Sequence, residues 1–448
     1  MNKAWPATLF PALLFLAVAV FPGAAPAFQE FQYLHRNLPF IPGPAAPEDY
    51  FGSGLGRGDF NGDGYADLAV GVQGEDIDGE ANAGGVYVLY GSPGGMRDTG
   101  VQHWDQGVAP HVDLLESNDF FGGVLAAGDF NGDGFADLAV GTPNESLSTI
   151  PSMGSVSVFY GSPSGLVAAG RHSFIQYTSP REGDNFHEAG DYFGVALAAA
   201  DFNGDGYADL AVAASGEDIG SVENAGAVNV LYGAPSGLGF AADAGNQFWH
   251  QDVSGMEDTA EAGDRFGSVL TAGDFNADGY ADLAVGAWSE DIGSIEGAGA
   301  THVLYGSSTG LTTQGDQFWH QDVAGILDQA ETNDNFGIAL DAGDYNGDGF
   351  VDLAIGAKSE DINGVTCAGA VHVLYGSATG LTTQGDQFWH QDVSGISAKA
   401  NDFDFYGSAL ASGDFDGNGC DDLAVGFPDG EYMVGIVNVL FGSLSGLS

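Results

Sequence analysis

A nine-residue acidic segment recurs six times along this chain, and its period constrains the fold more than any other feature of the sequence. The first copy, DFNGDGYAD, runs from Asp59 to Asp67. Further copies begin at Asp129, Asp201, Asp274, Asp344 and Asp414, so that successive copies lie 70 to 73 residues apart. A fixed period is typical of a solenoid, a propeller or an array of domains.

Each period also contains four short runs with the character of β-strands. An aromatic–Gly pair opens the period, an apolar run such as DLAVG follows the acidic segment, and runs such as VYVLYGS and QFWHQD complete it. Gly, Asp, Asn and Ser separate these runs, and none has the length and period of a helix. Four strands per repeat predict one propeller blade. We therefore predict an all-β propeller of six four-stranded blades over residues 49–448, with repeats starting near 51, 121, 193, 266, 336 and 406.

The two ends of the chain predict how the ring closes. The sixth period stops at Ser448 without its aromatic run, whereas QYLHRN at residues 32–37 resembles QFWHQD. His35 precedes Phe51 by the same 16 residues that separate His250 from Phe266. Residues 28–48 are therefore predicted to contribute a closing strand and a Pro-rich linker, with the strand completing the last blade. An open array of six domains is the alternative.

The acidic segments are predicted to bind Ca²⁺, up to six ions with one in each blade. Side-chain oxygens at positions 1, 3, 5 and 9 and the backbone carbonyl at position 7 can converge on one ion, and a set of hard oxygen ligands favours Ca²⁺ over zinc. Without a cation, carboxylates this close repel one another. A solvated acidic hairpin is the alternative. The predicted ligands are Asp59, Asn61, Asp63, Tyr65, Asp67, Asp129, Asn131, Asp133, Phe135, Asp137, Asp201, Asn203, Asp205, Tyr207, Asp209, Asp274, Asn276, Asp278, Tyr280, Asp282, Asp344, Asn346, Asp348, Phe350, Asp352, Asp414, Asp416, Asn418, Cys420 and Asp422.

Two details of the acidic segments bear on their geometry. Position 6 is glycine in all six copies, which predicts a positive φ there, whereas position 4 is Ala277 in the fourth copy and need not be glycine. The sixth copy exchanges acid and amide, with Asp416 at position 3 and Asn418 at position 5. Its carboxylate count is unchanged.

Charge and motif content exclude several classes of function. The chain has 9 Lys and Arg against 62 Asp and Glu, a formal net charge of -53. Such a surface repels nucleic-acid phosphates and anionic lipid, so nucleic acid is not an expected partner. The sequence also lacks G-x-S-x-G, H-E-x-x-H and P-loop motifs, which disfavours an enzyme without excluding one.

The N-terminus predicts export. Lys3, the apolar stretch 9–21 and Ala25-Pro26-Ala27 have the order of a secretory signal, so residues 1–27 are predicted to be cleaved near Ala27. The protein is then expected to be secreted to the extracellular space or the periplasm; an uncleaved anchor is the alternative. No later run approaches the length of a membrane span. Cys367 and Cys420, predicted on opposite faces, are expected to be free thiols.

The combination FG…GDFNGDGYADLAVG…GVYVLYGS resembles the FG-GAP repeats of integrin α-subunit propellers and their secreted bacterial relatives. The resemblance covers about residues 49–448 and implies propeller blades with Ca²⁺ in the loop between the first two strands. Integrin α chains have seven repeats, of which only some carry such loops, whereas this chain has six and all six carry them.

The resemblance implies a binding or adhesion module whose partner is an extracellular protein or glycan. We expect the propeller to be monomeric. The acidic loops between the second and third strands, and those between blades, share one face and are the expected binding surface. Two alternatives stay open. One is an extracellular lyase or hydrolase acting on polysaccharide, and the other is a generic propeller whose acidity maintains solubility in a saline habitat.

Overall fold

The computed structural model describes residues 32–108, 115–147, 150–176, 188–239, 246–396, 399–428 and 435–448. The predicted signal segment, residues 1–27, lies outside the described residues. Among those that are described, no helix is long and apolar enough to cross a membrane.

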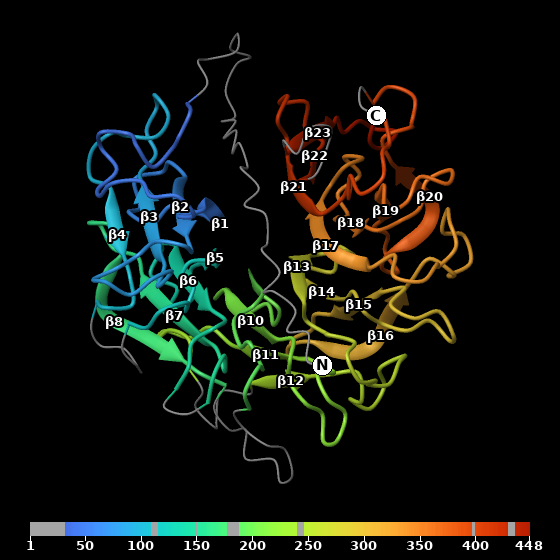
Figure 1. Cartoon of the computed structure of the whole chain (residues 1–448), viewed down its shortest axis with the longest axis horizontal. Helices are drawn as coiled ribbons and strands as arrows, with labels where there is room; N and C mark the ends of the chain where they lie inside the picture. The colour runs from blue at the N-terminus through green and yellow to red at the C-terminus, as the bar shows by residue number, and fades with distance from the viewer. Residues whose placement is uncertain are drawn as a thin grey trace, which may run out of the picture.

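Six small antiparallel sheets surround a common axis and form a six-bladed β-propeller, which confirms the predicted fold class (Figure 1). Within each sheet the strands follow one another in chain order. The first three blades comprise β1 (Phe51–Gly58), β2 (Asp67–Val72), β3 (Gly85–Leu89), β4 (Gln102–Trp104); β5 (Val124–Gly128), β6 (Asp137–Thr142), β7 (Ser155–Tyr160), β8 (Val167–Phe174); and β9 (Leu197–Ala200), β10 (Asp209–Ala214), β11 (Ala227–Leu231), β12 (Gln247–Trp249).

The remaining blades comprise β13 (Val269–Gly273), β14 (Asp282–Ala287), β15 (Ala300–Tyr305), β16 (Thr312–Trp319); β17 (Phe336–Gly343), β18 (Asp352–Ala357), β19 (Ala370–Tyr375), β20 (Thr382–Trp389); and β21 (Ala409–Gly413), β22 (Asp422–Phe427), β23 (Ile436–Leu440). The first strand of each blade lies nearest the axis, and successive first strands pack against one another from β1 through β5, β9, β13 and β17 to β21.

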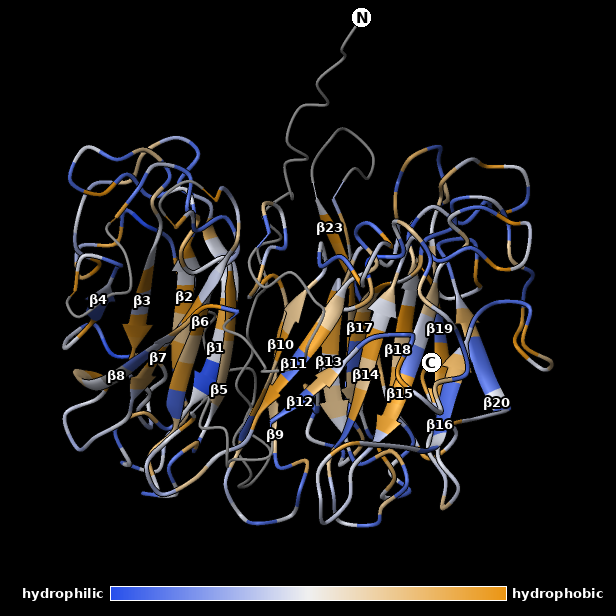
Figure 2. Cartoon of the chain, turned by 90° about the horizontal axis from the view of Figure 1, so that it is seen from below, coloured by the Kyte–Doolittle hydropathy of each residue, from blue (hydrophilic) through white to orange (hydrophobic). Residues whose placement is uncertain are grey.

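The second strand of every blade is buried along its whole length. In the inner blades a neighbouring blade covers each face of this strand, whereas Leu34, Leu38 and Ile41 of the N-terminal segment pack against β2 of the first blade. Figure 2 shows that most strands are hydrophobic, that the outer strands β4 and β20 are hydrophilic, and that hydrophilic loops lie at both ends. Glycines permit the blades to approach this closely. A Cβ atom added at Gly71 of β2 would lie 1.8 Å from the carbonyl oxygen of Gly122, the glycine of the next blade's aromatic–Gly pair. The repeated glycines are therefore packing residues.

The loops gather at two faces, as predicted. At the Asp-loop face, the acidic segments (here the Asp-rich loops) meet the loops between third and fourth strands, as when Gly91 N donates to Asp67 Oδ1 at 2.8 Å. At the opposite face, the loops between second and third strands meet the segments between blades, as when Asn333 N donates to Glu296 O at 2.9 Å. Both cysteines are free thiols, as expected.

The N-terminal segment docks on the first blade. Met96 N donates to Gln32 Oε1 at 2.8 Å, and Gln32 Nε2 donates to Met96 O at 3.1 Å. Gln317, at the end of a fourth strand, likewise donates to Leu381 of the following blade. The segment thus lies on the first blade as a preceding blade's fourth strand would.

Among residues 32–48 and 435–448, which the structure describes, the predicted pairing of the N-terminal strand with the last blade is not formed. The sixth sheet has three strands, and Val437 and Val439 of β23 are exposed, as is Tyr33. Ring closure by a paired N-terminal strand is therefore not shown. The missing pairing joins residues some 400 positions apart, whereas the contacts to the first blade join residues 64 apart or fewer.

Two histidines are buried in third strands without hydrogen-bond partners. Neither ring nitrogen of His302 or His372 has a partner among the described residues. Each imidazole lies between phenylalanine rings, with centroids 4.6 Å apart for His302 and Phe318. Burial lowers the pKa of each histidine to about 3, so both are neutral in the folded protein.

The seam is testable by cross-linking. We propose that residues 32–36 pair with β23 in the closed ring, which places Tyr33 opposite Asn438, as Phe248 lies opposite Asn229 in the third blade. Directly opposed Cα atoms are close enough for a disulfide. With both native cysteines changed to serine, Tyr33→Cys/Asn438→Cys should form an intramolecular disulfide, detected by thiol counting and mass spectrometry.

The matched control is Asn229→Cys/Phe248→Cys, whose strands are already paired. If the control closes while the seam pair stays reduced, or links only in dimers, the seam assignment is wrong.

The buried histidines predict a specific acid sensitivity. Their pKa is depressed in the folded state, so the stability they contribute is present above the unfolded value of about 6.5 and is lost as pH falls toward 3. At pH 5 the loss reaches up to about 2 kcal/mol for each histidine. The double variant His302→Asn/His372→Asn should show no such loss, because asparagine does not titrate. Other blades carry Ser157 and Asn229 at this strand position, so the fold accommodates a small polar side chain there. Urea denaturation at pH 8 and pH 5 should show wild type losing more stability than the variant; equal losses would contradict the assignment.

Candidate metal centre

In each Asp-rich loop, backbone amides donate hydrogen bonds to side-chain oxygens of the same loop. In the first copy, Asp63 N donates to Asp59 Oδ1 at 3.1 Å and to Asn61 Oδ1 at 2.9 Å, and Gly64 N donates to Asp59 Oδ2 at 2.8 Å. The same bonds recur in every blade, for example from Gly349 N to Asp344 Oδ2 at 3.0 Å. Positions 1, 3 and 5 are thereby held within one tight turn.

The aspartate at position 9 ties two loops together. Asp67 Oδ2 accepts a hydrogen bond from Phe60 N at 2.9 Å, while its Oδ1 accepts one from Gly91 N at 2.8 Å. All six copies make this pair of bonds. Burial, together with the charges of Asp59 and Asp63, raises the pKa of Asp67 to about 6 despite these bonds. Burial raises the pKa of Asp137, Asp209, Asp282 and Asp352 to about 7.

Positions 4 and 6 of the loop both have positive φ. Position 6 does so in all six copies, as predicted, with φ of 87° at Gly64. Position 4 is also left-handed, with φ of 69° at Gly62 and 54° at Ala277, so the alanine is accommodated at a conformational cost of about 1 kcal/mol. A Cβ at Gly62 would approach Phe135, the position-7 aromatic of the next blade, to 2.5 Å. Adjacent Asp-rich loops are therefore in contact.

Three acidic clusters among the described residues could bind metal ions, and one of them is the sixth Asp-rich loop. There, carboxylate oxygens of Asp414, Asp416 and Asp422 lie within 4.8 Å of one another. The exchange of acid and amide has a structural reason: Asn418 Nδ2 donates to Gly442 O at 2.9 Å, which a carboxylate cannot do. In the first loop, Asp63 forms an ion pair with Arg97.

The two other clusters were not predicted and lie at the opposite face. They comprise Glu261, Asp264 and Glu290, and Glu331, Asp334 and Glu360. In each, the aspartate precedes the last glutamate by 26 residues, so the carboxylates come from different loops and no local motif marks them. The recurrence of this Asp–Glu spacing in successive periods was the available signal.

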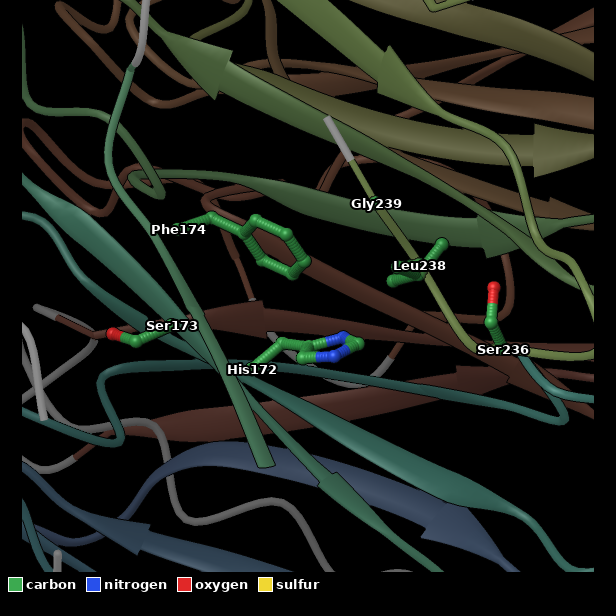
Figure 3. Close-up of a pocket in the computed structure, with 6 residues that line it drawn as sticks. All are labelled: His172, Ser173, Phe174, Ser236, Leu238 and Gly239. Carbon is green, nitrogen blue, oxygen red and sulfur yellow. The ribbon is translucent and has the colours of Figure 1, made fainter. Parts of the chain in front are cut away.

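A shallow pocket between the second and third blades offers no comparable chemistry. Figure 3 shows His172 and Phe174 of β8 lying near Leu238 and Ser236 of the segment after β11. His172 Nδ1 lies 3.0 Å from the Tyr160 hydroxyl, which also accepts a hydrogen bond from Leu238 N. None of the described residues that line it carries a carboxylate, and the contacts given above join two blades.

Comparisons with known proteins agree with the blade assignment. The FG-GAP repeat profile matches residues 51–89, 121–159, 193–231, 266–304, 336–374 and 406–440. A phosphatidylinositol-glycan-specific phospholipase D of Mus musculus is 31% identical over 183 residues, 40% of this chain and 20% of that protein. Integrin alpha-PS2 of Drosophila melanogaster is 28% identical over 254 residues, 55% of this chain and 16% of that protein.

This chain thus spans a fifth or less of the length of these two relatives. The solved structure of rhamnogalacturonan lyase YesW covers 86% of this chain, which covers 66% of that one, at 13% identity and a TM-score of 0.39. A likeness at that level carries no argument about fold or activity. The matches to the FG-GAP repeat profile fall on all six blades and together span half of the sequence. The chain therefore belongs to the FG-GAP repeat family.

Proposed function

We propose that this protein is a secreted, calcium-stabilised β-propeller that serves as a binding or adhesion module for an extracellular protein or glycan. The observation that carries the proposal is the repetition of one oxygen-lined turn in every blade of an FG-GAP propeller. Similarity to integrin α chains supports the binding role that the resemblance of the repeats implies.

Electrostatics support calcium as the stabilising ion. Each loop places three carboxylates in one turn of a chain whose formal net charge is -53. The position-9 carboxylates are buried, and burial raises their pKa because the charged form is poorly solvated there. A divalent cation among oxygen ligands relieves both the repulsion and the desolvation, and six sites at about 10⁻⁴–10⁻³ M suit extracellular calcium.

The opposite face offers the better surface for a partner. The interblade segments there present two large apolar side chains to solvent, Leu327 at 52% and Phe403 at 54% exposure. Large apolar groups surrounded by charge are typical anchors of protein interfaces. Because the surrounding loops are acidic, a partner carrying basic groups, or one bridged by a divalent ion, is favoured electrostatically.

Calcium removal tests the stabilising role. At tenfold saturation each site should stabilise the fold by about 1.4 kcal/mol, and six sites by about 8 kcal/mol. For a chain of this length, EDTA should therefore lower the Tm by about 10 °C, and Ca²⁺ should restore it better than Mg²⁺. The variant Asp278→Asn keeps the hydrogen bond that Tyr280 N donates to this side chain, as the sixth loop does with Asn418. Scanning calorimetry should show a smaller calcium-dependent rise in this variant and no loss of stability in EDTA. A Tm indifferent to EDTA in wild type would remove the basis for calcium.

A screen on arrayed extracellular-matrix proteins and glycans, with Ca²⁺ and with EDTA, tests the binding role. Leu327→Ser/Phe403→Ser should weaken any hit at least tenfold. The matched control is Leu444→Ser, an 87% exposed leucine at the Asp-loop face, which should leave binding unchanged. Absence of any calcium-dependent hit, or equal losses in both variants, would count against this surface.

A further inference from the structure

The two acidic clusters at the opposite face share one architecture. Each combines a buried aspartate and a buried glutamate with an exposed glutamate three residues before the aspartate: Glu261, Asp264 and Glu290 in one, Glu331, Asp334 and Glu360 in the other. Their carboxylate oxygens lie within 4.8 Å of one another. Asp264 and Glu290 are almost fully buried, so water neutralises little of this repulsion.

A buried glutamine completes each cluster with an unpartnered carbonyl. Gln251 Nε2 lies 2.5 Å from Glu290 Oε2, and Gln321 Nε2 lies 2.5 Å from Glu360 Oε2. Both glutamines are only 1% exposed, and Oε1 of each has no hydrogen-bond partner among the described residues. A half-turn of the amide about its last bond exchanges the two atoms and turns this carbonyl oxygen toward the carboxylates. Each cluster then offers only oxygen ligands.

The first blade shows what occupies the same place when the chain supplies its own cation. Arg36 stands 39 residues before Glu75, as Gln321 stands 39 residues before Glu360. Its guanidinium pairs with Glu75 and lies 3.8 Å from Asp49, and all three side chains are buried. A positive charge is therefore accommodated at this point of the fold.

The residues around Arg36 include fewer acidic side chains than those around Gln251 and Gln321. The first blade has Ala46 at the position of the exposed glutamate in the other clusters. It has Gly43 at the position of Asp258, whose Oδ2 lies 3.4 Å from Gln251 Nε2. Where arginine is present, the chain thus has two fewer acidic side chains.

We propose that the clusters around Glu290 and Glu360 each bind a divalent cation, Ca²⁺ by the hardness of their oxygen ligands, in the place that Arg36 fills in the first blade. These sites are separate from the Asp-rich loops and lie at the face proposed for partner binding. A bound ion there joins the segment leading out of one blade to the loop between the second and third strands of the next.

The test gives one proposed cation site the arginine and alanine of the first blade, and gives the first blade the glutamine and glutamate of the proposed sites. Gln321→Arg/Glu331→Ala should bind one Ca²⁺ fewer than wild type, measured by equilibrium dialysis and isothermal titration calorimetry. Arg36→Gln/Ala46→Glu should bind one more. Gln314→Arg, at an exposed position of β16, is the control for added charge and should leave the number of ions unchanged.

The count distinguishes this proposal from the one for the Asp-rich loops. If those loops bind no calcium, wild type binds few ions, but the two variants still differ from it by one in opposite directions. If the stoichiometry of Gln321→Arg/Glu331→Ala equals that of wild type, the cluster is a protonated, hydrogen-bonded group and the proposal is overturned. Should that variant not fold, the count in Glu360→Gln decides in the same way.

Discussion

The architecture of each blade depends on one buried carboxylate that accepts two backbone hydrogen bonds. The position-9 aspartate accepts one hydrogen bond from a backbone amide of its own loop and another from the loop after the third strand. Asp67, for example, accepts them from Phe60 N and Gly91 N. These bonds hold the ends of four strands in register at the Asp-loop face. The same bonds fix a charge beside two other carboxylates, so the group that organises the blade also carries an electrostatic cost. An ion or a proton has to offset that cost.

Much of this arrangement could be predicted from the sequence because the repeat displays it six times. A run such as DLAVG between two glycine-rich turns reads as a buried strand, and β2 and its counterparts are buried throughout. The assignment of loops to two faces followed from strand order alone. The positive φ at position 6 followed from comparing copies, whereas at position 4 the substitution to Ala277 concealed the same backbone conformation.

What the sequence did not reveal depends on contacts between distant residues. The clusters at the opposite face combine side chains 26 and 39 residues apart, so no short motif contains them. Burial of His302 and His372 could not be inferred either. The same strand position holds Ser157 in another blade, so the residue type there varies with the side chains that surround it. The seam differs again: its sequence pattern is clear, yet the structure forms only the half that contacts the first blade.

The first blade differs from the others in carrying its own cations at both faces. Arg97 pairs with Asp63 of the Asp-rich loop, and Arg36 pairs with Glu75 at the opposite face. Two of only nine Lys and Arg in the chain therefore lie at the acidic sites of one blade. This blade is also the one onto which the N-terminal segment docks. A fixed guanidinium neutralises charge at any calcium concentration, whereas a bound ion does so only above its dissociation constant. In the first blade, fixed cations thus neutralise part of the acidic charge at both faces without a bound ion.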